Sequence, residues 1–127
     1  MGKILLVDDA AFLRALLREI VESDGHTVVA EAADGADAIE KYRAYRPDLV
    51  ILDISMPEMG GMSALKAIMN ENPRARVVMC SALGTRHLIV EAIRLGAIDF
   101  ILKPFRTERV LEAVRRALSP AAQRAAD

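Results

Sequence analysis

The sequence predicts an α/β protein with a doubly wound, five-stranded parallel sheet in a (βα)5 arrangement. Two observations support this prediction. Short apolar runs of strand length alternate with segments in which apolar residues recur at helical spacing. The connections between them are short, which favours parallel strands joined by right-handed helical crossovers, with helices on both faces of the sheet.

The first half of the chain contains three of the expected strands. Its opening apolar run is continuous, which is typical of a strand covered on both faces. The second run carries Thr27 and Glu31, so we expect it at an edge of the sheet. Asp34 and Gly35 form the turn that begins the second helix. In order, the elements are a strand at 4–7, a helix with apolar residues at 12–21, a strand at 27–32, a helix with apolar residues at 38–42 and a strand at 49–52.

The second half of the chain continues the alternation. Pro73 and Gly96 end its first two helices, and Thr107 is the expected N-cap of the last helix, with Glu108 in the first turn. In order, the elements are a helix with apolar residues at 62–69, a strand at 77–80, a helix with apolar residues at 88–93, a strand at 98–102 and a helix from 107 to 118. We expect residues 1–119 to form a single domain and residues 120–127 to form a flexible C-terminal tail.

Composition argues against several classes of protein. The 127 residues suffice for one domain, and 17 basic against 18 acidic residues give a net charge of −1. No basic field points to nucleic acid, and no polybasic run points to a membrane surface. The apolar runs are far shorter than the ~20 residues of a membrane-spanning helix. Cys80 is the single cysteine and cannot form an internal disulfide, which favours a reducing cytoplasm.

Charged residues directly follow three of the predicted strands. Asp8 and Asp9 follow the first strand, Asp53 follows the third and Lys103 follows the fifth. Because the carboxyl ends of parallel strands meet at one edge, we expect these side chains to share a pocket there. Taken singly, each has an ordinary interpretation, since an aspartate after a strand often caps a helix and Lys-Pro often forms a turn. Their coincidence at one edge favours a functional site.

The residue types in this pocket suggest phosphoryl transfer. Carboxylate oxygens are ligands for Mg²⁺ or Mn²⁺, and a divalent cation would relieve a repulsion of roughly 4 kcal/mol between two carboxylates about 4 Å apart. A carboxylate is also a nucleophile that can accept a phosphoryl group as an acyl phosphate. The metal and Lys103 would neutralise the charge of the transferring group. Ser81, one residue past the fourth apolar run, could donate a hydrogen bond to a phosphate oxygen.

Four motifs, in this order, resemble one family. They are Val7-Asp8-Asp9, the run from Leu52 to Gly61, Ser81-Ala82 and Lys103-Pro104-Phe105. Over roughly residues 3–118 the sequence is similar to response-regulator receiver domains, and among them to stand-alone chemotaxis regulators. The resemblance implies a flavodoxin-like fold with strand order 2-1-3-4-5 and a single receiver domain at 1–119.

The resemblance implies a role for each residue of the pocket. Asp53 would be the phosphoacceptor, and Lys103 and Ser81 would contact the phosphoryl group. The implied ligands of Mg²⁺ (or Mn²⁺) are Asp8, Asp9, the Asp53 carboxylate and the backbone carbonyl of Ser55.

Further expectations from the family concern residues around the pocket. Ser81 and Phe100 would form the conformational switch, with Phe100 acting through packing alone because it has no hydroxyl. Ser55 and Leu83 occupy the positions that tune the lifetime of the phosphate. The Lys103-Pro104 peptide bond would be cis, as it is in the family.

The implied function is that of a phosphorylation-activated regulator in a two-component system. A histidine kinase would supply the phosphoryl group, and the output would be protein binding, with the flagellar motor switch as the target. A phosphatase would be a further partner. The protein would not be a conventional enzyme, although it would catalyse its own phosphorylation from phosphohistidine and its own dephosphorylation.

Several alternatives stay open at this point. The chain could be a phosphorelay intermediate or a receiver with a different, non-flagellar output. A metal-dependent hydrolase of the haloacid dehalogenase type would need Asp-x-Asp after the first strand, whereas Asp8 and Asp9 are adjacent. A flavodoxin-like cofactor carrier would need a Ser/Thr/Gly-rich phosphate cradle after that strand, which the sequence lacks.

Overall fold

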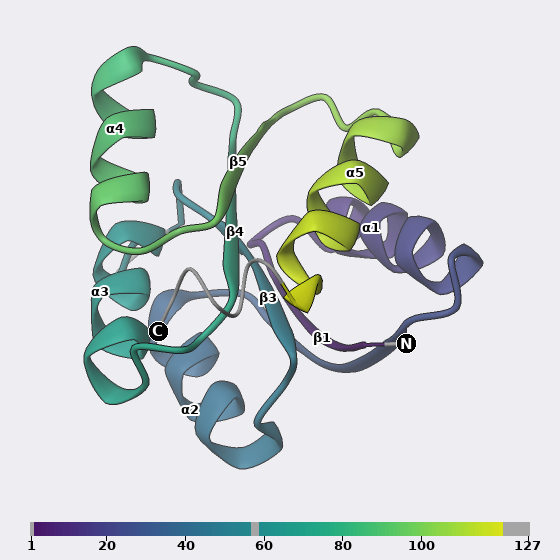
Figure 1. Ribbon diagram of the computed structural model, residues 1–127, viewed down its shortest axis with the longest axis horizontal. Helices are drawn as coiled ribbons and strands as arrows, with labels where there is room; N and C mark the ends of the chain where they lie inside the picture. The colour runs from purple at the N-terminus through teal and green to yellow at the C-terminus, as the bar shows by residue number, and fades with distance from the viewer. Residues whose placement is uncertain (1, 57–58, 121–127) are drawn as a thin grey trace.

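The computed structural model describes residues 2–56 and 59–120, and in these ranges the chain folds around a five-stranded parallel sheet (Figure 1). The strand order is β2-β1-β3-β4-β5, as the family resemblance implied. The strands are β1 (Lys3–Val7), β2 (Thr27–Ala32), β3 (Leu49–Asp53), β4 (Val77–Ser81) and β5 (Asp99–Leu102).

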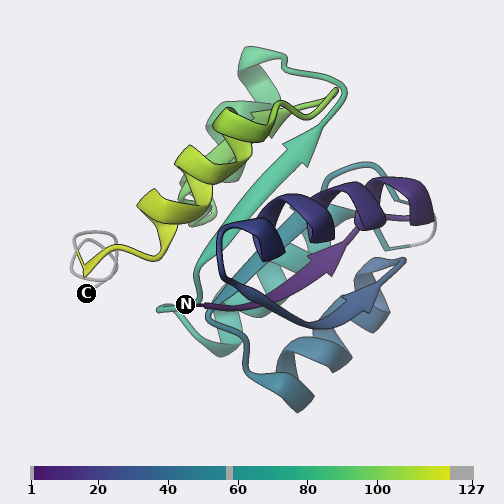
Figure 2. The ribbon, with the colours of Figure 1, turned by 90° about the vertical axis from the view of Figure 1, so that its right-hand side faces the viewer.

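Helices cover both faces of the sheet. Helices α1 and α5 pack on one face, and α2, α3 and α4 pack on the other (Figures 1 and 2). The helices are α1 (Ala11–Ser23), α2 (Gly35–Tyr45), α3 (Gly61–Glu71), α4 (Arg86–Arg94) and α5 (Thr107–Ala117). None of these helices is both long enough and apolar enough to cross a membrane.

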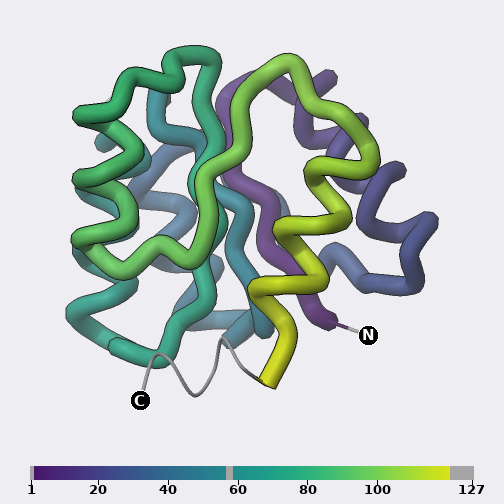
Figure 3. The backbone as a smooth tube through the Cα atoms, turned by 45° about the horizontal axis from the view of Figure 1, so that its top comes forward, coloured from purple at the N-terminus to yellow at the C-terminus, as the bar shows by residue number. Residues whose placement is uncertain are grey.

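The period of two along each strand divides the apolar residues between two cores. In β1, Leu5 and Val7 belong to the core beneath α2, α3 and α4, whereas Ile4 and Leu6 belong to the core beneath α1 and α5. The central strands are therefore buried on both faces, which explains their continuous apolar sequences. Because the strands are parallel, their carboxyl ends lie at one edge of the sheet, and the loops after β4 and β5 emerge there (Figure 3).

The predicted elements agree with the observed ones to within a few residues, with two differences at the helices. The apolar repeat of α1 is wider than its buried stripe, because Phe12 is 74% exposed and Leu16 is 39% exposed. Thr107 is the first residue of α5 and not its N-cap. That position belongs to Arg106, whose side chain makes no capping hydrogen bond.

Local signals end and begin the other helices as expected. Asp34 caps α2 by accepting a hydrogen bond from the Asp37 backbone N–H through its side chain. Gly96 follows α4 with a φ of 115°, a left-handed conformation that glycine adopts without the penalty of a side chain. The Lys103-Pro104 bond is cis, as predicted. Two parts of the sequence analysis, Pro57-Glu58 in the third-strand motif and residues 121–127 of the tail, lie outside the described residues.

Candidate functional site

Two buried aspartates and one lysine meet at the carboxyl edge of the sheet. Lys103 Nζ lies 3.0 Å from Asp8 Oδ2 and 3.2 Å from Asp53 Oδ1. Asp8 is fully buried and Asp53 is 1% exposed, whereas the Lys103 side chain is 16% exposed. Three of the side chains expected at this edge therefore meet there, and Lys103 is the most exposed of the three.

Strand alternation explains why these three side chains meet. Each lies two residues beyond an apolar residue of the core beneath α1 and α5, so it continues that row at the end of the strand. The pairs are Leu6 with Asp8, Ile51 with Asp53 and Ile101 with Lys103. The face of the sheet on which the apolar residues pack also fixes the direction of the charged groups.

The two carboxylates differ in how their oxygens are bound. Asp8 Oδ1 accepts a hydrogen bond of 2.9 Å from the Ala10 backbone N–H, and the Arg14 guanidinium donates to the Asp8 carbonyl at 2.6 Å. Asp8 Oδ2 and both carboxylate oxygens of Asp53 are buried and, apart from the Lys103 ion pairs, have no hydrogen-bond partner in the described part of the chain. Because buried charges are costly unless they are paired, these oxygens are strong candidates for ligand binding.

The electrostatics of the site reflect this shortage of partners. Burial raises the pKa of Asp53, the charge of Asp8 raises it further, and the charge of Lys103 only partly opposes the rise. Burial alone would lower the pKa of Lys103, but its hydrogen bond to Asp8 and the charges of both aspartates raise it above its ordinary value. Lys103 is therefore a firmly held ammonium, and a second cation would stabilise the ionised form of Asp53.

The donor set fits a divalent cation that prefers oxygen ligands. One ligand atom from each of Asp8, Asp53 and Cys80 lies within 4.8 Å of the others. Burial raises the pKa of the Cys80 thiol and keeps it neutral, so the charged donors are the carboxylates. Oxygen donors of this kind suit Mg²⁺ or Mn²⁺. Asp9, predicted to share the pocket, is exposed to solvent beside it.

Cys80 is the member of the cluster that the sequence analysis missed. It pairs with Asp53 in the register of β3 and β4, and it belongs to the core beneath α1 and α5. The available signal was its place as the last apolar residue of its run, which puts it at the same sheet edge as Asp53. Its position makes it the packing residue beside the Asp53 carboxylate.

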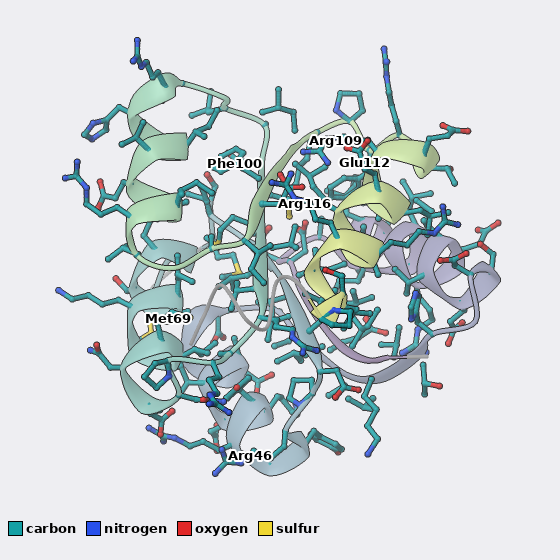
Figure 4. All side chains as sticks on the ribbon, in the orientation of Figure 1. Arg46, Met69, Phe100, Arg109, Glu112 and Arg116 are labelled. Atoms are coloured by element: carbon teal, nitrogen blue, oxygen red, sulfur yellow. The ribbon has the colours of Figure 1, made fainter. Side chains whose placement is uncertain are left out.

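Phe100 lies on the opposite face of the sheet from the acids, and strand alternation directs Ser81 away from the face of its neighbour Cys80. Ser81 is buried, and its hydroxyl oxygen accepts a hydrogen bond of 3.0 Å from the Leu83 backbone N–H. Phe100 is 8% exposed and packs in the core beneath α2, α3 and α4, where Figure 4 shows it beside β5. Ser55 and Leu83 are both exposed near the ends of β3 and β4, where solvent reaches them.

Comparison with known proteins gives one consistent family. A family model for the response regulator receiver domain matches residues 4–115. The chemotaxis protein CheY of Bacillus subtilis is 51% identical over 117 residues, which cover 92% of this chain and 98% of the relative. CheY of Thermotoga maritima is 49% identical over 117 residues, which cover 91% of this chain and 98% of the relative.

Solved structures share the same architecture. The crystal structure of the CheX-CheY-BeF3-Mg²⁺ complex from Borrelia burgdorferi contains a chain that matches with a TM-score of 0.90 and 39% sequence identity. The match covers 92% of this chain and 89% of that chain. The receiver-domain structure of CheB from Thermotoga maritima matches with a TM-score of 0.85 and 39% identity, over 91% of this chain and 95% of that chain.

Proposed function

The chain belongs to the response regulator receiver domain family, and we propose that it is a single-domain chemotaxis regulator that phosphorylation of Asp53 activates. The observation that carries the proposal is the pair of buried carboxylates, Asp8 and Asp53, which share the Lys103 ammonium and have oxygens left over. In the proposed assignment, residues 1–119 form the receiver domain and the protein acts in the cytoplasm. Its fold class and strand order agree with this family.

Phosphoryl transfer would proceed by attack of an Asp53 oxygen on the phosphorus of a phosphohistidine in a histidine kinase. The new O–P bond forms as the P–N bond breaks, and the leaving imidazole takes the electron pair and then a proton from solvent. Lys103 lies 3.2 Å from Asp53 Oδ1, so its ammonium is placed to follow the charge onto the phosphoryl oxygens. In dephosphorylation, a water oxygen attacks the same phosphorus and Asp53 leaves as a carboxylate.

Asp8, Asp9, the Asp53 carboxylate and the backbone carbonyl of Ser55 are the proposed ligands of Mg²⁺ or Mn²⁺. When bound, the ion would neutralise part of the negative charge of the transferring phosphoryl group. Asp8 would contribute Oδ2, which pairs with the Lys103 ammonium, while Oδ1 stays bound to the Ala10 N–H. Asp9 follows Asp8 directly and is exposed, so its side chain is accessible to an ion from solvent.

The phosphoryl group would then change the surface through Ser81 and Phe100. Phosphorylation adds about −1.5 to −2 units of charge and new acceptor oxygens. The Ser81 oxygen already accepts from Leu83, which leaves its hydroxyl hydrogen to be donated to a phosphoryl oxygen. If Ser81 moves toward the phosphate, the loop after β4 shifts and Phe100 can fill the space that is left.

The energy of the switch indicates that partner binding contributes to it. Charge-assisted hydrogen bonds contribute about 1.5–3 kcal/mol each. Moving a two-state population from 1:99 to 99:1 requires about 5.5 kcal/mol. One or two new bonds therefore give a partial shift, and binding of the output protein supplies the remainder.

The proposed partners follow from the relatives. A histidine kinase supplies the phosphate, and a flagellar motor-switch protein or another output protein binds the activated form, as expected of a chain similar to CheY. A phosphatase is a further proposed partner. A CheX-like protein is another candidate, since a similar chain was crystallised in the CheX-CheY-BeF3-Mg²⁺ complex from Borrelia burgdorferi. Exposed Ser55 and Leu83 would tune the phosphate lifetime from positions that water and a partner can reach.

The decisive experiment is phosphorylation by a small acyl phosphate in the presence of Mg²⁺, followed by measurement of the intact mass. We expect one added phosphoryl group on the unsubstituted protein and none on Asp53→Asn. The control variant is Asp37→Asn. Asp37 lies on α2 and pairs with Lys41, so this variant should be phosphorylated normally. An unmodified wild-type protein, or equal labelling of Asp53→Asn, would refute the proposal.

A second measurement addresses the partners. A phosphotransfer profile against purified histidine kinases identifies the donor, and onward transfer of phosphate to a histidine protein would indicate a relay intermediate instead of a terminal regulator. Chelation of divalent cations should suppress labelling in both experiments.

A further inference from the structure

A third buried aspartate lies at the start of β5 and is bound from several sides. Asp99 is 9% exposed, and the Arg109 guanidinium of α5 donates to Asp99 Oδ1 at 2.8 Å and to Asp99 Oδ2 at 3.2 Å. Glu112 accepts from Arg109 at 3.0 Å, and Arg116 lies 4.0 Å from Asp99. Figure 4 shows these α5 side chains beside β5, next to the labelled Phe100.

This ion pair binds both backbone groups of Phe100. The Phe100 N–H donates to Asp99 Oδ1 at 2.7 Å, and Arg109 donates to the Phe100 carbonyl oxygen at 3.2 Å. Because β5 is an edge strand with β4 as its neighbour on one side, its other side has no strand to bond to. The ion pair therefore replaces a missing strand at one residue, and that residue is the switch aromatic.

The arrangement separates the main chain of Phe100 from its side chain. The main chain is tied to α5 through Arg109, whereas the ring packs in the core on the other face, with Ala92 of α4. Rotation of the ring about χ1 moves the ring only if the main chain stays in place. If β5 shifted instead, the main chain would move and the ring would not need to change its rotamer. Protection of an edge strand from aggregation would need no contact with the Phe100 carbonyl in particular.

We propose that Arg109, acting with Asp99, is a positioning residue for the Phe100 switch: it holds the Phe100 main chain against α5 so that the ring alone responds to the phosphorylated site. The proposal rests on the proposed function. It adds the α5 arginine to the path from Asp53 to the surface, because the same guanidinium contacts Asp99, Glu112 and Phe100.

Local hydrogen exchange tests the contact without any ligand. In Arg109→Met, hydrogen exchange of the Phe100 amide should be roughly tenfold faster than in the unsubstituted protein. The exchange rate of the Ile51 amide, in the central strand β3, should change only as much as the loss of global stability requires. Arg109→Lys keeps the charge but not the fork of donors, so it should give an intermediate rate. Arg115→Met is the matched control, since this α5 arginine pairs with Asp24 and should leave the Phe100 amide unchanged. Equal acceleration at Phe100 and Ile51 would overturn the positioning role.

Fluorine NMR of protein labelled with 3-fluorophenylalanine tests the switch itself. The chain has three phenylalanines, and Phe100→Leu identifies the Phe100 signal. Mg²⁺ with beryllofluoride, a phosphoryl mimic, should shift that signal in the unsubstituted protein and in Arg115→Met. In Arg109→Met, the change in chemical shift should be about half as large or smaller. A full response in Arg109→Met at reduced thermal stability would show that Arg109 is merely structural.

The two proposals fail in different ways. If Asp53 were not the phosphoacceptor, Asp53→Asn would respond to beryllofluoride like the unsubstituted protein, and the exchange result would still decide whether Arg109 holds Phe100. If the positioning role were wrong, Asp53→Asn would lose the response while Arg109→Met kept it.

Discussion

Asp53 and Asp99 are both buried aspartates of one sheet, on strands separated by β4, yet their surroundings are opposite. Asp53 lies at the end of β3 and faces the negative charge of Asp8, and within the described residues its carboxylate oxygens have no hydrogen-bond partner apart from the Lys103 ion pair. Asp99, at the start of β5, accepts hydrogen bonds from the Arg109 guanidinium and the Phe100 N–H. Burial raises the pKa of Asp53, whereas for Asp99 the bonds from Arg109 and Phe100 outweigh burial and lower the pKa.

The difference shows that burial does not by itself mark a reactive carboxylate. A buried aspartate whose oxygens accept hydrogen bonds, such as Asp99, stabilises the fold. A buried aspartate that lacks such partners, such as Asp53, lowers stability until a ligand such as a cation binds its oxygens. Five predictions on stability rest on this contrast, and each is measured as the free energy of unfolding in urea.

The largest effect is expected for Lys103→Met without divalent cations. The change leaves the buried carboxylates of Asp8 and Asp53 without their cation, and we expect a loss of about 3–5 kcal/mol at neutral pH. Lys41→Met, which removes the partner of Asp37 on α2, is the control and should change stability by less than about 0.5 kcal/mol. A loss below about 1 kcal/mol for Lys103→Met would mean that the two carboxylates do not depend on this lysine.

Asp99→Asn should be the next largest, with a loss of about 2–3 kcal/mol. The amide can still accept from the Phe100 N–H, but the Arg109 guanidinium loses its buried charged partner and keeps only the exposed Glu112. An unchanged free energy of unfolding would remove the contrast between the two aspartates, because Asp99 would then contribute no more than an exposed acid.

Asp53→Asn should act in the opposite direction and raise stability by about 1–2 kcal/mol in the absence of divalent cations. The substitution removes one of two like charges that share Lys103. Saturating Mg²⁺ should cancel or reverse this gain, because the ion stabilises only the protein that binds it. If Asp53→Asn were less stable than the unsubstituted protein in the presence of a chelator, the charge of Asp53 would not be destabilising.

The pH dependence of the same two variants gives opposite slopes. The folded-state pKa of Asp53 is raised, so its ionisation costs stability as pH rises above the ordinary value of 3.8, and the advantage of Asp53→Asn should grow with pH from there. The folded-state pKa of Asp99 is lowered, so its contribution is present above 3.8 and is lost as pH falls below it. Parallel profiles for the two variants would show that the two environments are alike.

The smallest effect belongs to an exposed carboxylate. Glu71 accepts from Arg43 at 2.7 Å, but both side chains are more than a third exposed. Arg43→Met should therefore change the free energy of unfolding by less than about 0.5 kcal/mol, and 0.5 M salt should remove the difference. A larger change would place surface ion pairs on the same scale as the buried ones.

Much of this molecule follows from local pattern in the sequence. Strand lengths, helix order and the convergence of Asp8, Asp53 and Lys103 are set by periodicity and by the geometry of parallel strands, both of which act over a few residues. The exposure of Phe12 could not be predicted, since the helical repeat gives the direction of each side chain but not the width of the neighbour that covers it.

The site residues that escaped prediction depend on contacts distant in sequence. The burial of Asp8 and the exposure of adjacent Asp9 follow from which of the two continues the row of Leu6, and that needs the strand's exact end. Asp99 carried a signal, because a charged residue within an apolar run needs a partner. The choice of Arg109 over the other arginines near α5 requires the docking of α5 on the sheet.

In β4, strand alternation places consecutive residues on opposite faces of the sheet. Cys80 lies with Asp53 on the α1/α5 side and Met79 lies on the α4 side, so the alternation directs Ser81 toward the α4 side. In the proposed switch, the signal would therefore cross the sheet between Cys80 and Ser81. An insertion of one residue into β4 would preserve its apolar composition but exchange the two sides. Such a variant would keep Asp53 as a phosphoacceptor, but phosphorylation would no longer change the surface on the α4 side.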